Sequence, residues 1–175
     1  MCHDELARRK SFSGAFYWGL SRMRSFKPIL LVEDDTVDAM TVKRAFKDLN
    51  VTNPLVRATN GEHALEYLQD SANAEPCVIL LDLNMPKMNG IEFLKIAKAD
   101  DRLKCIPVVV LTTSKADQDR FECFNHSAAG YIVKPVDYKG FVEAMRILNL
   151  YWTLSELPGG DLEYKDVKLE NVVCS

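Results

Sequence analysis

The amino-acid sequence predicts an α/β fold, a doubly wound sheet of five parallel strands in the order 2-1-3-4-5. Two observations point to this class. Five short apolar runs alternate along the chain with segments that carry apolar residues at helical spacing. A helical segment also follows every strand, which is the pattern of parallel strands joined by right-handed crossovers. In such a sheet the ligand crevice lies at the carboxyl ends of strands 1 and 3, where the winding reverses.

The five expected strands are apolar runs bounded by turn-forming residues. They cover residues 29–32, 55–59, 77–82, 106–112 and 131–134. The third run ends in "LLDLNMPKMNG", where the proline and the Asn-Gly pair indicate a loop. Asp82 therefore stands where an apolar strand leaves the core. An ionised carboxylate at such a position is costly unless it is paired, hydrogen-bonded or bound to a metal.

Helical segments fill the intervals between the strands. They are expected at residues 36–49, 61–69, around 91–97, at 117–126 and from 137 to about 157. The domain is thus expected to span residues 28–157. Residues 1–27 are rich in Lys and Arg and are expected to form a mobile basic extension. Residues 158–175, which begin with Pro-Gly-Gly, are expected to form a polar tail.

The composition of the 175 residues is that of a soluble globular protein, with a net charge of −3. No apolar run is long enough to span a membrane, so no membrane association is expected. The chain after residue 27 is acidic, which argues against nucleic acid as a main partner. The five cysteines are scattered and form no C-x-x-C motif. They are interpreted as free thiols of a cytoplasmic protein.

Polar residues end four of the expected strands. They are Glu33-Asp34-Asp35 after the first, Asp82 after the third, Thr112-Thr113-Ser114 after the fourth and Lys134 after the fifth. Carboxylates at close range repel each other, and a hard cation such as Mg²⁺ would relieve that repulsion. A metal ion, an ammonium group and a hydroxyl together would stabilise a phosphoryl group in transfer. Asp82, central among the strands, is the best candidate for a nucleophile that forms an acyl phosphate.

Each of these residues also has an ordinary structural interpretation. Asp35 or Thr36 could cap the following helix, and Thr112 could cap the fourth helix. Asp82 could form an Asx-turn. Lys134 and the proline after it could simply mark the exit from a strand. The coincidence of all four at the correct strand ends favours a functional site.

Four motifs, "ILLVEDD", "VILLDLNMPKMNG", "VVVLTTS" and "AAGYIVKP", follow one another between residue 28 and about residue 150. In their order and spacing the chain resembles the receiver domain of two-component response regulators, which has a flavodoxin-like fold. The "EDD" and "LTTS" motifs and the ending "YWTLSELP" are similar to those of the small single-domain regulators that serve bacterial phytochromes.

The resemblance implies a role for each matching residue. Asp82 would be the phosphoacceptor that takes a phosphoryl group from a histidine of a sensor kinase. Asp34, Asp82 and the backbone carbonyl of Asn84 would ligate Mg²⁺, and Glu33 would help through a water molecule.

The resemblance also assigns the responding residues. Lys134 would pair with the phosphoryl oxygens, and its peptide bond to Pro135 would be cis. Thr112 would hydrogen-bond the phosphoryl group and move toward it, with Thr113 as the alternative hydroxyl. Tyr131 would be an aromatic switch whose inward turn repacks the face made by the fourth helix, the fifth strand and the fifth helix.

The function expected from these residues is that of a single-domain response regulator, with no enzymatic activity beyond self-catalysed phosphoryl transfer and dephosphorylation. Too few residues follow the last helix for a DNA-binding domain, so output would run through a downstream protein target or a phosphotransfer protein. One alternative is a phosphohydrolase of the haloacid-dehalogenase type, which needs an acid/base aspartate where Asn84 stands. Another is a receiver-like binding module that is never phosphorylated.

The last helix predicts a homodimer. Between residues 141 and 157 apolar side chains cover nearly two sides of the helix, whereas packing on a sheet requires only one. An exposed second apolar side is typical of an association site. The alternative is that the N-terminal extension, with Phe16, Tyr17, Trp18 and Leu20, folds back over that side.

Overall fold

A computed structural model describes the chain from residue 27 to residue 154, with side chains up to residue 152. The strands are β1 (Ile29–Val32), β2 (Leu55–Ala58), β3 (Val78–Leu81), β4 (Val108–Thr112) and β5 (Gly130–Val133). The helices are α2 (Thr36–Asp48), α3 (Gly61–Gln69), α4 (Gly90–Ala99), α5 (Asp117–Asn125) and α6 (Tyr138–Leu154). The basic extension before residue 27, the polar tail and the end of the predicted last helix lie outside the described residues.

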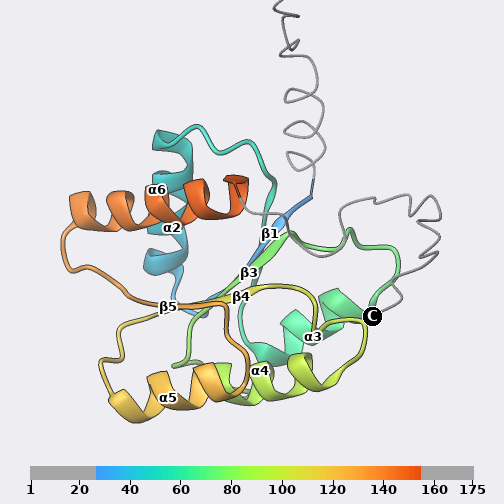
Figure 1. Cartoon of the computed structure of the whole chain (residues 1–175). Coiled ribbons are helices and arrows are strands. Elements are labelled where there is room, and N and C mark those ends of the chain that lie inside the picture. The colour runs from blue at the N-terminus through green and yellow to red at the C-terminus, as the bar shows by residue number, and fades with distance from the viewer. Residues whose placement is uncertain (1–26, 155–175) are drawn as a thin grey trace, which may run out of the picture.

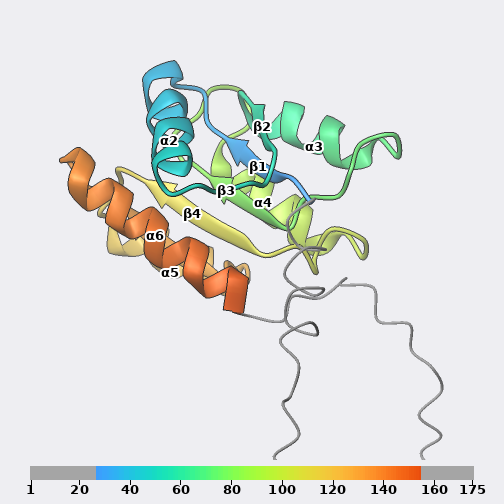
Figure 2. The ribbon, with the colours of Figure 1, turned by 90° about the horizontal axis from the view of Figure 1, so that it is seen from above.

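All five strands are parallel and form one sheet in the order β2-β1-β3-β4-β5, which confirms the predicted fold class and topology (Figure 1). Seen from above, β2, β1, β3 and β4 follow one another across the sheet (Figure 2). The element ends differ from the prediction by up to two residues. The largest difference is at β4, which begins after Pro107 because proline has no N–H to donate to a strand ladder.

The helices cover both faces of the sheet. α2 and α6 lie on one face, and α3, α4 and α5 lie on the other (Figure 1). Side chains alternate along each strand, so Ile29 and Leu31 pack toward α2 and α6, whereas Leu30 and Val32 pack toward the other three helices. Burial on both faces explains why β1, β3 and β4 are uninterrupted apolar runs.

Side-chain caps fix the starts of four helices, including α6, where Oδ1 of Asp137 accepts the N–H of Gly140 at 2.7 Å. Asp35 accepts hydrogen bonds from the first turn of α2, and Asn60 does so at α3. Asn89 and Glu92 form a reciprocal capping box at α4. α5, which begins after Ala116, has no side-chain cap. The four capped helices all start at the carboxyl-end edge of the sheet, so the caps fix the surroundings of that edge.

Gly90 allows α4 to begin directly against the end of β3. A Cβ atom at this position would lie 2.2 Å from the backbone oxygen of Asp82, a distance that no real contact allows. The Gly90 N–H also donates to the carbonyl oxygen of Leu83 at 3.0 Å. The loop after Asp82 is therefore held by close backbone packing, which fixes the direction of that aspartate.

The predicted cis peptide bond between Lys134 and Pro135 is wrong, because none of the peptide bonds that the structure describes is cis. The trans form is the ordinary preference of a bond before proline. Three cysteines lie in the described region, Cys77, Cys105 and Cys123, and all three are free thiols as expected. No helix between residues 27 and 154 is long and apolar enough to cross a membrane.

Candidate functional site

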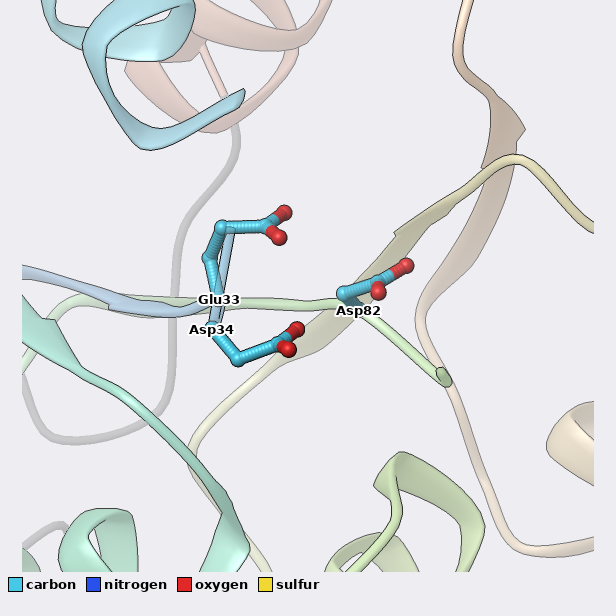
Figure 3. Close-up of side chains that lie close together, drawn as sticks. All are labelled: Glu33, Asp34 and Asp82. Carbon is cyan, nitrogen blue, oxygen red and sulfur yellow. The ribbon is translucent and has the colours of Figure 1, made fainter. Parts of the chain in front are cut away.

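Three carboxylates meet at the carboxyl ends of β1 and β3. Glu33, Asp34 and Asp82 each place one oxygen within 4.8 Å of the others (Figure 3). The strand register explains this arrangement, because Val32 of β1 lies opposite Leu81 of β3. The residues that follow are therefore neighbours, and the N–H of Asp82 donates to the carbonyl oxygen of Val32 at 2.9 Å. The carboxylate cluster predicted from the strand ends is present.

Two of the three carboxylates are almost fully buried. Glu33 is 1% exposed and Asp82 is 6% exposed, whereas Asp34 is half-buried. Burial raises the pKa of Glu33 from 4.5 to about 6, although the hydrogen bond from Lys134 and its positive charge act in the opposite direction. The site therefore contains a carboxylate for which ionisation is costly without additional positive charge.

One oxygen of Asp82 is left without a hydrogen bond. Oδ2 accepts the backbone N–H of Asn84 at 3.2 Å. Oδ1 is buried and accepts no hydrogen bond, and Nζ of Lys134 lies 3.6 Å away, beyond hydrogen-bonding distance. A buried carboxylate oxygen without a partner is expensive. Because this oxygen lies at the centre of an acidic cluster, the arrangement is typical of a site that binds a cation or another electrophilic group.

Lys134 is the only cation among the described residues that forms ion pairs with the carboxylates of the cluster. Its backbone N–H donates to the carbonyl oxygen of Thr112 at 2.8 Å, which fixes it at the end of β5. Its ammonium group donates to Oε2 of Glu33 at 2.6 Å and to Oδ2 of Asp38 at 2.7 Å. Burial lowers the pKa of Lys134, but the hydrogen bonds to Asp38 and Glu33 outweigh that effect and raise it overall. The ammonium group is therefore charged at neutral pH.

Asp38 was missed by the sequence analysis. It lies in the first turn of α2, where an acidic residue is ordinary because it complements the helix dipole. A stronger signal was available. Helical side chains lean toward the amino end of the helix, and the amino end of α2 adjoins the carboxyl end of β1. An acid in that first turn is therefore directed back toward the carboxylate cluster.

The predicted hydroxyl and aromatic residues lie on the neighbouring strands. Thr112 ends β4 and is fully buried, whereas Thr113 is exposed. The Oγ1 atom of Thr112 accepts the backbone N–H of Ser114 at 3.2 Å. Tyr131 of β5 is half-buried and donates its hydroxyl to the carbonyl oxygen of Ser114 at 3.1 Å. Both residues thus contact the same loop after β4, while the choice between the two threonines stays a prediction.

The family model for the response regulator receiver domain matches residues 29–146. The chain is 37% identical over 127 residues to the probable methanogenesis regulatory protein FilR2 of Methanothrix harundinacea, an alignment that covers 71% of this chain and 82% of that protein. It is 35% identical over 130 residues to the response regulator Rcp1 of Synechocystis, and this alignment covers 72% of this chain and 88% of Rcp1.

Solved structures of response regulators are also similar to this chain. The phosphorylated cyanobacterial phytochrome response regulator RcpA superposes with a TM-score of 0.71 at 36% identity, covering 76% of this chain and 99% of that one. The Mn²⁺-bound form of Rcp1 superposes with a TM-score of 0.70 at 34% identity, covering 75% and 99%. The bacteriophytochrome response regulator AtBRR superposes with a TM-score of 0.61 at 36% identity, covering 75% and 98%.

Proposed function

We propose, since this chain belongs to the family of response regulator receiver domains, that Asp82 accepts a phosphoryl group from a histidine of a sensor kinase in a Mg²⁺-dependent reaction. The observation that carries the proposal is the unpartnered, buried Oδ1 of Asp82 among two further carboxylates and an ammonium group. The likeness to RcpA and AtBRR supports a kinase of the phytochrome type. The signal then passes to a downstream protein, or the phosphoryl group passes to a phosphotransfer protein.

The donor set fits a magnesium ion. The three carboxylates offer hard oxygen atoms at mutual distances that one cation could bridge. Asp34, Asp82 and the backbone carbonyl of Asn84 are the proposed ligands, with Glu33 acting through water. When bound, the cation would neutralise the negative charge that gathers where the phosphoryl group meets the carboxylates. The Mn²⁺-bound form of Rcp1 supports this assignment by similarity.

The chemistry of this chain's own residues follows from the geometry. A lone pair of the Asp82 carboxylate attacks the phosphorus atom of the phosphohistidine, forming an O–P bond while the N–P bond breaks. The electron pair of the broken bond stays on the imidazole nitrogen of the kinase. Lys134 and Thr112 would donate hydrogen bonds to the phosphoryl oxygens. Attack by water on the same phosphorus atom would later release phosphate, so the chain resets itself without acting on a separate substrate.

Thr112 and Tyr131 are proposed to carry the response. Thr112 moves toward the phosphoryl group, and the side chain of Tyr131 then turns inward. In the unphosphorylated chain the carbonyl oxygen of Ser114 accepts the Tyr131 hydroxyl, and the N–H of Ser114 binds Thr112. A shift of the loop around Ser114 would therefore affect both residues. That coupling links the phosphorylated strand end to the face formed by α5, β5 and α6.

A homodimer through α6 is part of the proposal. The side of α6 that includes Phe141, Met145 and Leu148 is buried against the sheet. A second apolar side, with Ile147, Leu150 and Tyr151, is exposed among the described residues. A two-fold pair would bury the same side of both copies. Sedimentation at micromolar concentration, with and without a small acyl phosphate, tests the pairing, and a monomer in both states would contradict it.

Intact-mass measurement tests the central step. The protein is incubated with Mg²⁺ and acetyl phosphate, and the expected product carries one added phosphoryl group. Asp82→Asn should add none, and omission of Mg²⁺ should suppress the product in the parent protein. Asp35→Asn is the matched control, because Asp35 caps α2 and asparagine caps equally well. A phosphorylated Asp82→Asn protein at the parent's level would refute the assignment.

A further inference from the structure

We propose that Asp38 is a positioning residue that holds the ammonium group of Lys134 off Asp82 before phosphorylation. The inference rests on the proposed function and deepens it. Asp38 does not touch the reacting atoms; it acts through Lys134. As a result, the attacking oxygen of Asp82 accepts no hydrogen bond, although the ammonium group of Lys134 lies only 3.6 Å from it.

The three distances around the ammonium group carry the argument. Nζ of Lys134 lies 2.6 Å from Glu33 and 2.7 Å from Asp38, both short hydrogen bonds to carboxylates. Its distance to Oδ1 of Asp82 is 3.6 Å. Two of the three N–H groups of Lys134 are thus used by acceptors other than the phosphoacceptor. Oδ1 of Asp82 remains buried and accepts no hydrogen bond.

The position of Asp38 is itself fixed. Oδ1 of Asp35 accepts the N–H groups of Val37 and Asp38 at 2.7 and 3.0 Å, which sets the first turn of α2. Arg57 binds the backbone carbonyl oxygens of Glu33 and Asp34 at 3.0 and 2.7 Å, which holds the segment leading into that turn. The carboxylate of Asp38 therefore occupies a defined place beside Lys134, and its side chain is 40% exposed, so its charge is partly hydrated.

Removal of Asp38 would change the partner of Lys134. With only Glu33 left as a close carboxylate, the next carboxylate oxygen near the ammonium group is Oδ1 of Asp82, at 3.6 Å. A hydrogen bond formed there would occupy the lone pair that attacks phosphorus. It would also have to break when a phosphoryl group arrives, so the phosphorylated state would gain no new bond from Lys134. With Asp38 present, the bond from Lys134 to a phosphoryl oxygen is a net gain.

Beryllofluoride, a trigonal mimic of a phosphoryl group on a carboxylate, tests the inference. Its affinity at saturating Mg²⁺ is measured by ¹⁹F NMR titration. Asp38→Asn and Asp38→Ala should each bind about tenfold more weakly than the parent, which is the effect of losing one charge-assisted hydrogen bond. Asp38→Glu should restore most of the affinity. Asp35→Asn, which removes a charge from the same helix start without contacting Lys134, should stay within about twofold of the parent.

A crystal structure of Asp38→Ala supplies the second measurement. The expected distance from Nζ of Lys134 to Oδ1 of Asp82 is below about 3.2 Å, the usual limit of a hydrogen bond. Equal or tighter beryllofluoride binding by the Asp38 variants overturns the inference, as does an equal loss in Asp35→Asn. A lower melting temperature with unchanged beryllofluoride affinity would mean that Asp38 only stabilises the contact between α2 and β5. That result also overturns the inference. If the parent protein does not bind beryllofluoride, the proposed function itself fails.

Discussion

The interior strands of the sheet are packed more firmly than the edge strand β5. Every residue of β1, β3 and β4 is buried. All four residues of β5, at one edge, are only half-buried. The neighbouring helix α5 begins without a side-chain cap and exposes Phe121 and Phe124 by 71% and 51%. The interior strands carry the carboxylates, and the looser edge carries Lys134 and Tyr131.

This difference separates two requirements of the proposed phosphorylation switch. Oxygens that share a cation or attack phosphorus need fixed positions, and strands buried on both faces provide them. Residues that change position on phosphorylation need a second arrangement of similar free energy, which is available where little apolar surface is buried. The carboxylates are thus assigned to the rigid part of the sheet. The response is assigned to its edge strand β5 and to Thr112, which lies at the very end of the adjoining strand β4.

The largest expected effect is on the stability of the interior strands. Leu80→Ala removes a fully buried side chain from β3 and should lower the free energy of unfolding by about 3 kcal/mol. Ile132→Ala, in half-buried β5, should lower it by about 1 kcal/mol because less packing is lost. Urea denaturation gives both values. Equal losses at the two positions would show that β5 is packed as firmly as β3.

Glu33 should produce a pH dependence of stability. Its pKa rises from 4.5 in the unfolded chain to about 6 in the folded one, so the folded state binds its proton more tightly. The resulting stabilisation is fully present below pH 4.5 and is lost as the pH rises through 6, a loss of about 2 kcal/mol. Denaturation without divalent cations, compared between the parent protein and Glu33→Gln, isolates this contribution. A constant difference between the two proteins from pH 4 to pH 7 would contradict it.

Magnesium should stabilise the fold by relieving repulsion among the carboxylates. At a concentration tenfold above its dissociation constant the expected gain is about 1.4 kcal/mol, seen as a rise in melting temperature. Asp34→Asn removes one of the proposed ligands. This variant should melt at a higher temperature than the parent without Mg²⁺ and should show little further rise with it. An unchanged melting temperature of the parent across millimolar Mg²⁺ would argue against the metal site.

The smallest effect concerns the uncapped helix. Ala116→Ser gives α5 a side-chain oxygen at its N-cap position and should add about 0.5–1 kcal/mol of stability. Slower amide exchange confined to the first turn of α5 would show where the gain arises. If the packing argument is correct, the same variant should weaken the dependence of dimerisation on phosphorylation. If α5 is stabilised but dimerisation depends on phosphorylation as before, the low stability of α5 has no role in the response.

The fold was predictable because its strands are short and apolar and its helices alternate with them. The register of β1 and β3 then follows from the topology, which is why Glu33, Asp34 and Asp82 could be placed together from strand ends alone. Lys134 could be placed for the same reason. Strand boundaries were less certain, since apolar residues such as Ile106 continue past the hydrogen-bonded ladder.

Two features of the site escaped the sequence. Asp38 was missed because an acidic residue in the first turn of a helix is ordinary, and its direction toward Lys134 follows only when α2 is placed after β1 and beside β5. The trans bond before Pro135 was mispredicted because the two isomers of such a bond differ little in free energy. The roles of Thr112 and Tyr131 stay predictions, since both describe a movement between two states.

Amide hydrogen exchange, with and without beryllofluoride and Mg²⁺, tests most directly whether chemistry and response occupy different parts of the molecule. Protection should change in α5, β5 and α6 and in the loop around Ser114. The amides of β1 and β3 should exchange as slowly as before, apart from those next to Glu33 and Asp82. Changes spread evenly over the sheet, or confined to the carboxylate loops while α5 and β5 stay unchanged, would contradict it.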